Sequence, residues 1–340
     1  MCSRKIRRST DGPSGRSTVD SAGPGAPKRS TAWIRSLRGP KPHLDPWQPA
    51  GAEVEWERDR DGEVVPVGTA FLTNRECPFT CLMCDLWQYT TDESVPAGAV
   101  DRQVEAALVQ LPDVRQLKLY NAGNFFDDRA IAPGDRDAIA RRLGALDVAV
   151  LENHPKLVDE RVRRFRDDAG TAIDVAMGLE TAHTEVLRRL NKGMTLDDFS
   201  VAAERLLSWD VQVRAFILLR PPWLSEAEGL DWACRTLDFA WSVGVECCSI
   251  IPTRPGNGAL DVLAQEGHFT PPSLRSLEAA VEYGVSRGRG RVFGDLWDIE
   301  RFVGCARCSA DRVERIRTMN LQQTVPPALT CDCETTGASA

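Results

Sequence analysis

The 340-residue sequence has no apolar run near the roughly 18 residues of a membrane-spanning helix, and it does not open with a charged segment followed by an apolar one. These absences predict a soluble, cytoplasmic protein with no membrane contact. The length suits one large domain, since α/β barrels often run to about 200–250 residues. The eleven cysteines are mostly clustered, which in such a chain indicates metal or cluster ligands rather than disulfides.

Charge is unevenly distributed along the chain. Residues 1–50 contain ten Lys and Arg but three Asp, so they carry +7, whereas residues 51–340 carry −14. The basic segment is rich in Ser, Gly and Pro, a composition typical of a disordered tail. It can be a solvated extension or a mis-assigned start, an electrostatic arm for nucleic acid, or an organellar transit peptide, and the sequence leaves these alternatives open.

Three cysteines stand close together in the stretch from Glu76 to Asp85. Cys77, Cys81 and Cys84 have the spacing C-x3-C-x2-C, with no fourth cysteine nearby. Three thiolates on one short loop can bind three irons of a [4Fe-4S] cube. The fourth iron of such a cube would be open to another ligand.

From about residue 66, strand-like and helix-like segments alternate, which predicts a parallel sheet with helices outside it. The predicted strands are 65–73, 116–120, 148–152, 173–180, 211–219 and 245–252. The predicted helices are 102–111, 135–143, 158–166, 185–207 (as two helices) and 226–243. The cysteine loop follows the first strand, and the later strands end in polar or Gly/Pro-rich residues. In barrels of this kind the reactive site lies at those strand ends.

The cysteine motif and its surroundings resemble the radical S-adenosylmethionine (radical SAM) superfamily, although Met83 stands where that superfamily commonly has an aromatic residue. The resemblance implies an α/β fold, a (βα)6 partial TIM barrel over residues 51–290, with a C-terminal cysteine-bearing region at 291–340. It implies that S-adenosylmethionine binds the open iron and is cleaved reductively to a 5′-deoxyadenosyl radical, which abstracts hydrogen from a substrate. It also implies an electron donor such as flavodoxin or ferredoxin.

Further strand ends resemble cofactor-binding segments of the superfamily. Gly123 and Asn124 lie in a Gly-rich segment that would meet the methionyl amino group, and an Asn-Gly turn is the alternative. Glu180 resembles the fourth-strand position that contacts the amino acid or ribose of S-adenosylmethionine, and an ion pair with Arg188 or Lys192 is the alternative. The following residues 185–195 resemble the Val-Leu-x-x-x-Asn-Lys-Gly stretch of radical enzymes related to the elongator catalytic subunit and tRNA methylthiotransferases.

Arg220 shares a strand face with Arg214 and would bind the methionyl carboxylate or an anionic substrate, unless it forms a structural ion pair. The segment 252–258 resembles the adenine-side loop of the same enzymes. Glu152 and His154 resemble part of a Glu-Ser-Arg-Pro stretch in elongator-like and archaeosine-pathway radical enzymes, with His154 in place of Arg.

The remaining cysteines give two further hypotheses. Cys247 and Cys248 must point to opposite faces of their strand, so one of them is a candidate catalytic thiol, and a small buried apolar role is the alternative. No other catalytic residue is identified. Cys305, Cys308, Cys331 and Cys333 form a second set that would bind zinc or an auxiliary iron-sulfur cluster, or remain unligated.

These features together predict a radical SAM enzyme acting on a small-molecule or nucleobase-derived substrate. A tRNA-modifying or nucleobase-modifying enzyme is the first alternative, but the acidic balance of residues 51–340 does not favour direct tRNA binding. An iron-sulfur protein that transfers electrons or senses redox state is an alternative of another class, and it would leave the polar strand ends unexplained.

Overall fold

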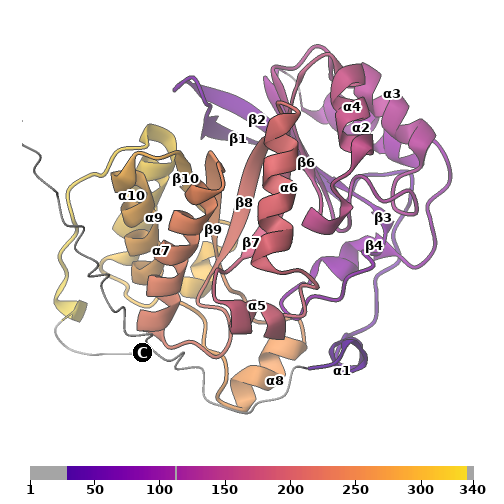
Figure 1. The fold of residues 1–340 in the computed structure, drawn as a ribbon. Helices are drawn as coiled ribbons and strands as arrows, with labels where there is room; N and C mark the ends of the chain where they lie inside the picture. Colours follow the sequence, from indigo (N-terminus) through magenta and orange to yellow (C-terminus); the bar gives the residue numbers. More distant parts are fainter. Residues whose placement is uncertain (1–28, 112, 335–340) are drawn as a thin grey trace, which may run out of the picture.

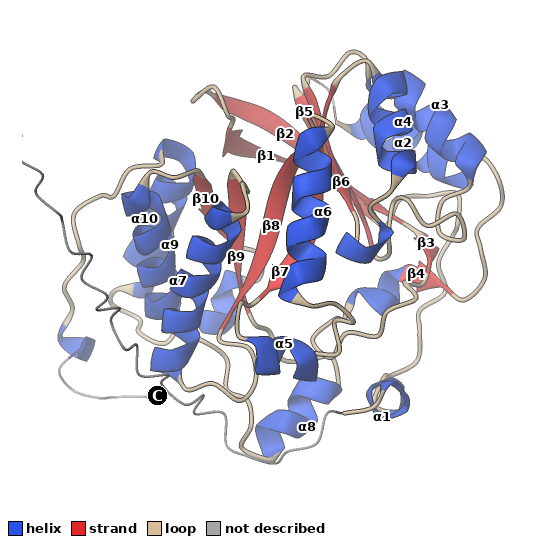
Figure 2. Cartoon of the chain, in the orientation of Figure 1, coloured by secondary structure: helices blue, strands red, loops and turns tan. Residues whose placement is uncertain are grey.

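The computed structural model describes residues 29–111 and 113–334. Its main sheet has eight strands in the order β1-β2-β5-β6-β7-β8-β9-β10 (Figures 1 and 2). These are β1 (Gly51–Arg58), β2 (Val64–Leu72), β5 (Gln116–Asn121), β6 (Val148–Glu152), β7 (Ala172–Glu180), β8 (Gln212–Leu219), β9 (Cys247–Pro252) and β10 (Arg291–Gly294). β1 is antiparallel to β2, and the other neighbours are parallel. The predicted α/β partial barrel is confirmed.

Helices follow most of the parallel strands and cover the outer face of the sheet (Figure 2). The α-helices are α1 (Thr31–Ser36), α2 (Ala99–Gln110), α3 (Pro133–Leu143), α4 (Glu160–Ala169), α5 (Thr184–Arg189), α6 (Leu196–Ser208), α7 (Glu226–Ser242), α8 (Ala259–Gln265), α9 (Leu274–Arg287) and α10 (Ser309–Gln322). Short 3-10 helices are η1 (Leu86–Tyr89), η2 (Pro155–Leu157), η3 (Ile299–Phe302) and η4 (Asp332–Glu334), and β3 (Asn74–Arg75) pairs with β4 (Thr90–Thr91).

Local sequence signals explain where the helices begin. Thr195 and Ser225 start α6 and α7 with capping boxes, in which Asp198 and Glu228 bond back to the cap. The two-helix prediction for 185–207 is confirmed by α5 and α6. Among the described residues, no helix is both long and apolar enough to cross a membrane.

Side chains on the strands alternate between an apolar outer layer and a polar interior. Leu117 and Leu119 of β5 belong to the large core under the helices, whereas Lys118 between them points to the opposite face. There Lys118 contacts Glu57 of β1, and Glu57 Oε2 also accepts a 2.7 Å bond from Arg214 Nη2 of β8. Because β1 and β8 stand five places apart in the sheet order, this contact requires a strongly curled sheet.

The two edge strands approach each other at one end of the curled sheet. Arg291 of β10 donates a 3.1 Å hydrogen bond from Nη1 to the Arg58 carbonyl of β1. α10 packs against both edge strands and against α9. The interior is therefore nearly closed at this end by the chain's C-terminal elements.

The basic N-terminal segment is only partly described. Residues 1–28, the larger part of the predicted tail, lie outside the described residues. Residues 31–36 form α1, whose Ile34 is buried against α5 and α8. In Figure 1, α1, α5 and α8 lie together at the lower end of the sheet, where the parallel strands β7 and β9 finish.

Candidate functional site

The loop of Cys77, Cys81 and Cys84 lies where β2 and the short β3 end, beside the carboxyl ends of the other parallel strands. Cys81 is 9% exposed, and the other two are partly buried. Burial raises the pKa of Cys81 to about 12 and also raises the pKa values of Cys77 and Cys84. Without a metal these thiols hold their protons, so a bound metal would have to displace them.

Hydrogen bonds from distant segments hold the cysteine loop in place. Asn191 Nδ2 donates to the Thr80 carbonyl at 2.7 Å, and Asn257 Nδ2 donates to the Leu82 carbonyl at 2.7 Å. The Leu82 N–H bonds to the Leu190 carbonyl at 2.8 Å. The Leu82 side chain is fully buried in a second apolar cluster with residues of α1, α5 and α8. The loop is thus fixed on both its polar and its apolar side.

Glu180 and Lys192 form a buried ion pair next to the cysteine loop. Glu180 Oε1 lies 2.7 Å from Lys192 Nζ, with side-chain exposures of 7% and 12%. Glu180 has φ +65° at a break in the β7–β8 register, which turns its carboxylate out of the regular strand direction. Burial lowers the pKa of Lys192, but the Glu180 carboxylate outweighs this and raises it overall. Of the two partners expected for Glu180, the structure shows Lys192; Arg188 pairs with Glu185.

His154 connects the end of β6 to the cysteine loop. Its ring stacks on Phe79, with centroids 3.7 Å apart. Nδ1 accepts from the Lys156 N–H, so Nε2 carries the proton and donates to the Lys192 carbonyl at 3.0 Å. Burial and the nearby Lys192 ammonium lower the His154 pKa to about 3, which keeps the ring neutral. Its role here is to position the loop and the Lys192 segment.

The segment after β5 places buried polar groups around the same loop. Asn124 Nδ2 donates to Cys77 Sγ at 3.3 Å, and its Oδ1 accepts from the His154 N–H at 2.7 Å. Both side-chain amide atoms of Asn121 are buried without a hydrogen-bond partner. Gly123 packs closely against β3, since a Cβ there would lie 2.7 Å from Asn74 Nδ2. Such unpaired polar atoms fit a site that receives a polar ligand.

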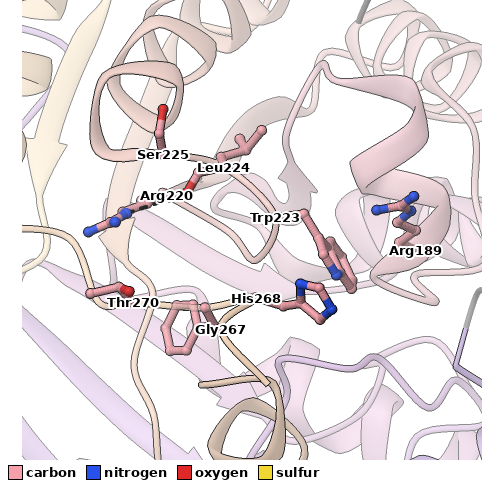
Figure 3. Close-up of a pocket in the computed structure, with 9 residues that line it drawn as sticks. Arg189, Arg220, Trp223, Leu224, Ser225, Gly267, His268 and Thr270 are labelled. Atoms are coloured by element: carbon pink, nitrogen blue, oxygen red, sulfur yellow. Dashed lines mark hydrogen bonds between the residues drawn. The ribbon is translucent and has the colours of Figure 1, made fainter. Parts of the chain in front are cut away.

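Arg220 lies at the end of β8 with φ +52°, and its guanidinium is already engaged. Nη1 lies 2.5 Å from Glu226 Oε2 and 2.8 Å from the Pro271 carbonyl. Arg220 also lines a pocket of about 420 Å³ with residues of α5, the β8–α7 loop and the α8–α9 loop, among them Trp223 and His268 (Figure 3). The three loop cysteines do not line this pocket.

Cys247 and Cys248 point to opposite faces of β9, as expected for adjacent strand residues. Cys248 belongs to the outer core, whereas Cys247 faces the interior near Arg214. Burial raises the pKa of both thiols. Cys247 is therefore the one of the two that faces the barrel interior, and it is a protonated thiol there.

The second cysteine set comes together in space. The Sγ atoms of Cys305, Cys308, Cys331 and Cys333 all lie within 4.8 Å of one another. Among residues 29–111 and 113–334, these four cysteines are the one group of three or more His, Cys, Asp or Glu side chains whose ligand atoms are close enough to share one ion.

Sequence reasoning missed several residues that shape the site. Asn257 and Phe79 lie in segments that the sequence singles out, but their contacts with distant parts of the chain are visible only in the structure, as is the burial of Asn121 without a hydrogen-bond partner. The Asn-Lys-Gly stretch resembles one in related radical enzymes, but only the structure shows that Asn191 in it donates a hydrogen bond to the cysteine loop.

Comparisons with known proteins give two relatives of one name. The chain is 27% identical over 270 residues to archaeosine synthase subunit beta of Methanosarcina acetivorans, covering 75% of this chain and 77% of that protein. It is 29% identical over 206 residues to the protein of the same name from Thermococcus kodakarensis, covering 58% and 63%. No family model matches the chain.

Among solved structures, the fold is similar to that of TsrM, a radical S-adenosylmethionine methyltransferase from Kitasatospora setae. The TM-score is 0.44 at 14% identity, over 58% of this chain. The chain spans 39% of the length of that protein.

Proposed function

We propose that the chain is a radical SAM enzyme, in which Cys77, Cys81 and Cys84 bind a [4Fe-4S] cluster with which it cleaves S-adenosylmethionine. When bound, these cofactors supply the radical that abstracts hydrogen from a substrate. The observation that carries the proposal is the buried cysteine loop, held beside the unpartnered Asn121 amide at the carboxyl ends of the strands.

The chain's own residues have distinct parts in this proposal. Asn121 and Glu180 offer acceptors, and Asn121 also a donor, for the polar groups of the methionyl moiety or ribose. Lys192 balances the charge of Glu180 and of the nearby thiolates. Gly123 and the 252–258 loop bring main chain close to the ligand. A direct contact from Arg220 requires it to leave Glu226.

The test is cofactor cleavage by reconstituted protein under anaerobic conditions. With dithionite and S-adenosylmethionine the protein should form 5′-deoxyadenosine, and Cys81→Ala should abolish this. Cys234→Ala is the matched control, because Cys234 lies on α7 and should leave product formation unchanged. A cluster-loaded wild-type preparation that makes no 5′-deoxyadenosine would overturn the proposal.

A nucleobase-derived substrate is the more specific candidate, supported by the name archaeosine synthase of two relatives. Deuterium transfer from a labelled candidate nucleoside into 5′-deoxyadenosine would support it. Transfer from an unrelated small molecule, with none from nucleosides, would point to a small-molecule enzyme instead. Direct tRNA binding should weaken with salt and on removal of residues 1–45.

A further inference from the structure

Four cysteine thiols from two segments converge beside α10, apart from the loop of Cys77, Cys81 and Cys84. Cys305 Sγ lies 4.0 Å from Cys331 Sγ, and Cys308 Sγ lies 3.7 Å from Cys333 Sγ. Each close pair joins one cysteine from before α10 to one from after it. The set therefore ties the beginning of α10 to the returning chain.

The spacing of the sulfur atoms distinguishes between the ways in which four cysteines can be used. A disulfide needs sulfurs at about 2.05 Å, so these cysteines are not oxidised pairs. Four sulfurs around one zinc ion, each at about 2.3 Å in a tetrahedron, lie about 3.8 Å apart. A four-iron cube binds each cysteine at a different iron, so its cysteine sulfurs are farther apart. All four thiols here lie within 4.8 Å, which fits one ion.

The local backbone forms a knuckle suited to metal binding. Cys308 directly precedes α10, and the Ser309 and Arg312 N–H groups bond to the carbonyls of Cys305 and Cys308 at 3.1 and 3.0 Å. The Cys305 N–H also donates to Ser309 Oγ at 3.3 Å. These bonds fix the backbone of Cys305 and Cys308 independently of Cys331 and Cys333.

A buried charged group supports the sulfur atoms from behind. Arg312 is 4% exposed, donates from Nε to Cys308 Sγ at 3.4 Å and also contacts Glu278 of α9. An N–H bond of this kind stabilises a thiolate, and the anchored Glu278 fixes the direction of the guanidinium. Arg315 binds the other Glu278 oxygen at 3.0 Å, which joins α9 to α10 behind the site.

Polar contacts alone hold the segment that carries the second pair of cysteines, among the contacts that the described residues make. None of residues 323–333 is fully buried, so the segment has no apolar anchor of its own. Arg315 bonds to the carbonyls of Pro326 and Pro327 at 2.8 and 2.9 Å, which fixes only the first half of the segment. Between the two cysteines, Asp332 pairs with Arg307 at 3.4 Å, and a metal ion would add a stronger attachment at Cys331 and Cys333.

We infer that Cys305, Cys308, Cys331 and Cys333 bind one zinc ion in a closed, four-thiolate structural site. Four protein ligands complete a tetrahedral shell and leave no position for water or substrate, so the ion attaches the C-terminal segment to α10 and takes no part in chemistry. The close spacing of the four sulfurs favours a single ion here over an auxiliary iron-sulfur cluster, whose cysteine sulfurs lie farther apart.

Metal analysis of the anaerobically purified, reconstituted chain tests this inference. The wild type should contain about one zinc and about four irons. Cys308→Ser with Cys333→Ser should lose the zinc and keep the irons, whereas Cys81→Ala should lose iron and keep the zinc. Cys234→Ser is the matched control and should keep both metals. About eight irons with no zinc, or zinc retained in the double variant, would overturn the inference.

Cobalt substitution keeps the test valid even if the double variant folds poorly. The wild-type chain grown with Co²⁺ in place of zinc should show the intense thiolate-to-cobalt charge-transfer and d–d bands of a tetrahedral sulfur site. Bands of a six-coordinate cobalt ion, or no cobalt bound, would contradict the four-thiolate assignment. Neither readout depends on cleavage of S-adenosylmethionine, so it stands apart from the proposed enzyme activity.

Discussion

Burial of the Glu152 carboxyl group beside the candidate site makes the stability of the folded chain depend on pH. Burial raises its pKa from 4.5 to about 7, and the Glu180 carboxylate adds to this, while Lys192 and the Asn121 N–H act in the other direction. Between these two pKa values the folded chain binds the proton more tightly than the unfolded chain. Its contribution to stability therefore falls as pH rises from about 4.5 through 7.

We expect Glu152→Gln to remove this pH dependence. At pH 8 the variant should exceed the wild type by about 1–3 kcal/mol in free energy of unfolding, and near pH 4.5 the two should be similar. Thermal unfolding at both pH values measures the difference. Glu204→Gln, at an exposed position on α6, is the control. Equal pH profiles for Glu152→Gln and the wild type would contradict the assignment.

Gly178 leaves the space that the Glu180–Lys192 ion pair occupies. A Cβ at this position would overlap both the Glu180 carboxylate and the Lys192 ammonium. Gly178→Ala should therefore separate the pair. The yield of 5′-deoxyadenosine should fall by about tenfold or more, because a loss of about 1.4 kcal/mol in the free energy of ligand binding lowers affinity tenfold. Gly134→Ala, where a Cβ meets nothing within 4 Å, should have no effect. Equal loss in both variants would argue against a specific role.

At the scale of elements, the sequence predicted regular strands well and irregular ones poorly. The strand predicted at 65–73 is β2 (Val64–Leu72), and the prediction is nearly right because β2 is a long run of mostly apolar residues. Neither β1 nor β10 is among the predicted strands: in β1 the apolar Val54 and Trp56 are exposed while the charged Glu57 is buried, the reverse of the usual pattern, and β10 has only four residues. The ion pair of Glu180 depends on a register break that no local pattern reveals.

Asn257, in the segment between β9 and α8, helps to hold the cysteine loop in place. Asn257 donates to the Leu82 carbonyl, and its Oδ1 caps α8 by accepting from the Leu260 N–H at 2.8 Å. Asn257→Asp keeps the cap and removes the donor. The unsatisfied carbonyl should cost about 1–2 kcal/mol and speed iron loss about 5- to 30-fold, measured by chelator challenge of the reconstituted protein.

Asn320→Asp makes the same chemical change far from this loop. Asn320 bonds to both the N–H and the carbonyl of Gly294, at 2.8 and 2.9 Å. Its variant should leave the rate of iron loss from the cysteine loop unchanged. If both variants lose iron equally fast, the effect belongs to general stability and not to the loop.

At the scale of the whole molecule, the buried charges inside the curled sheet hold distant strands together. Lys118 and Arg214 both bind Glu57, and all three side chains are largely buried. Lys118→Met should cost about 3–5 kcal/mol of unfolding free energy, because it leaves buried Glu57 with one cation fewer. Thermal or denaturant unfolding measures this loss. Lys156→Met, which breaks the exposed pair with Asp198, should cost no more than about 1 kcal/mol.

The contact of Glu57 with Arg214 also limits when the protein can fold during its synthesis. The two residues are 157 positions apart, so a ribosome must finish β8 before the carboxylate on β1 meets this cation. Until then, Glu57 on β1 has Lys118 on β5 but not Arg214 as a partner, and the sheet cannot curl closed. Nascent chains halted before residue 212 should remain protease-sensitive, whereas chains that extend beyond β10 should become resistant together along their whole length.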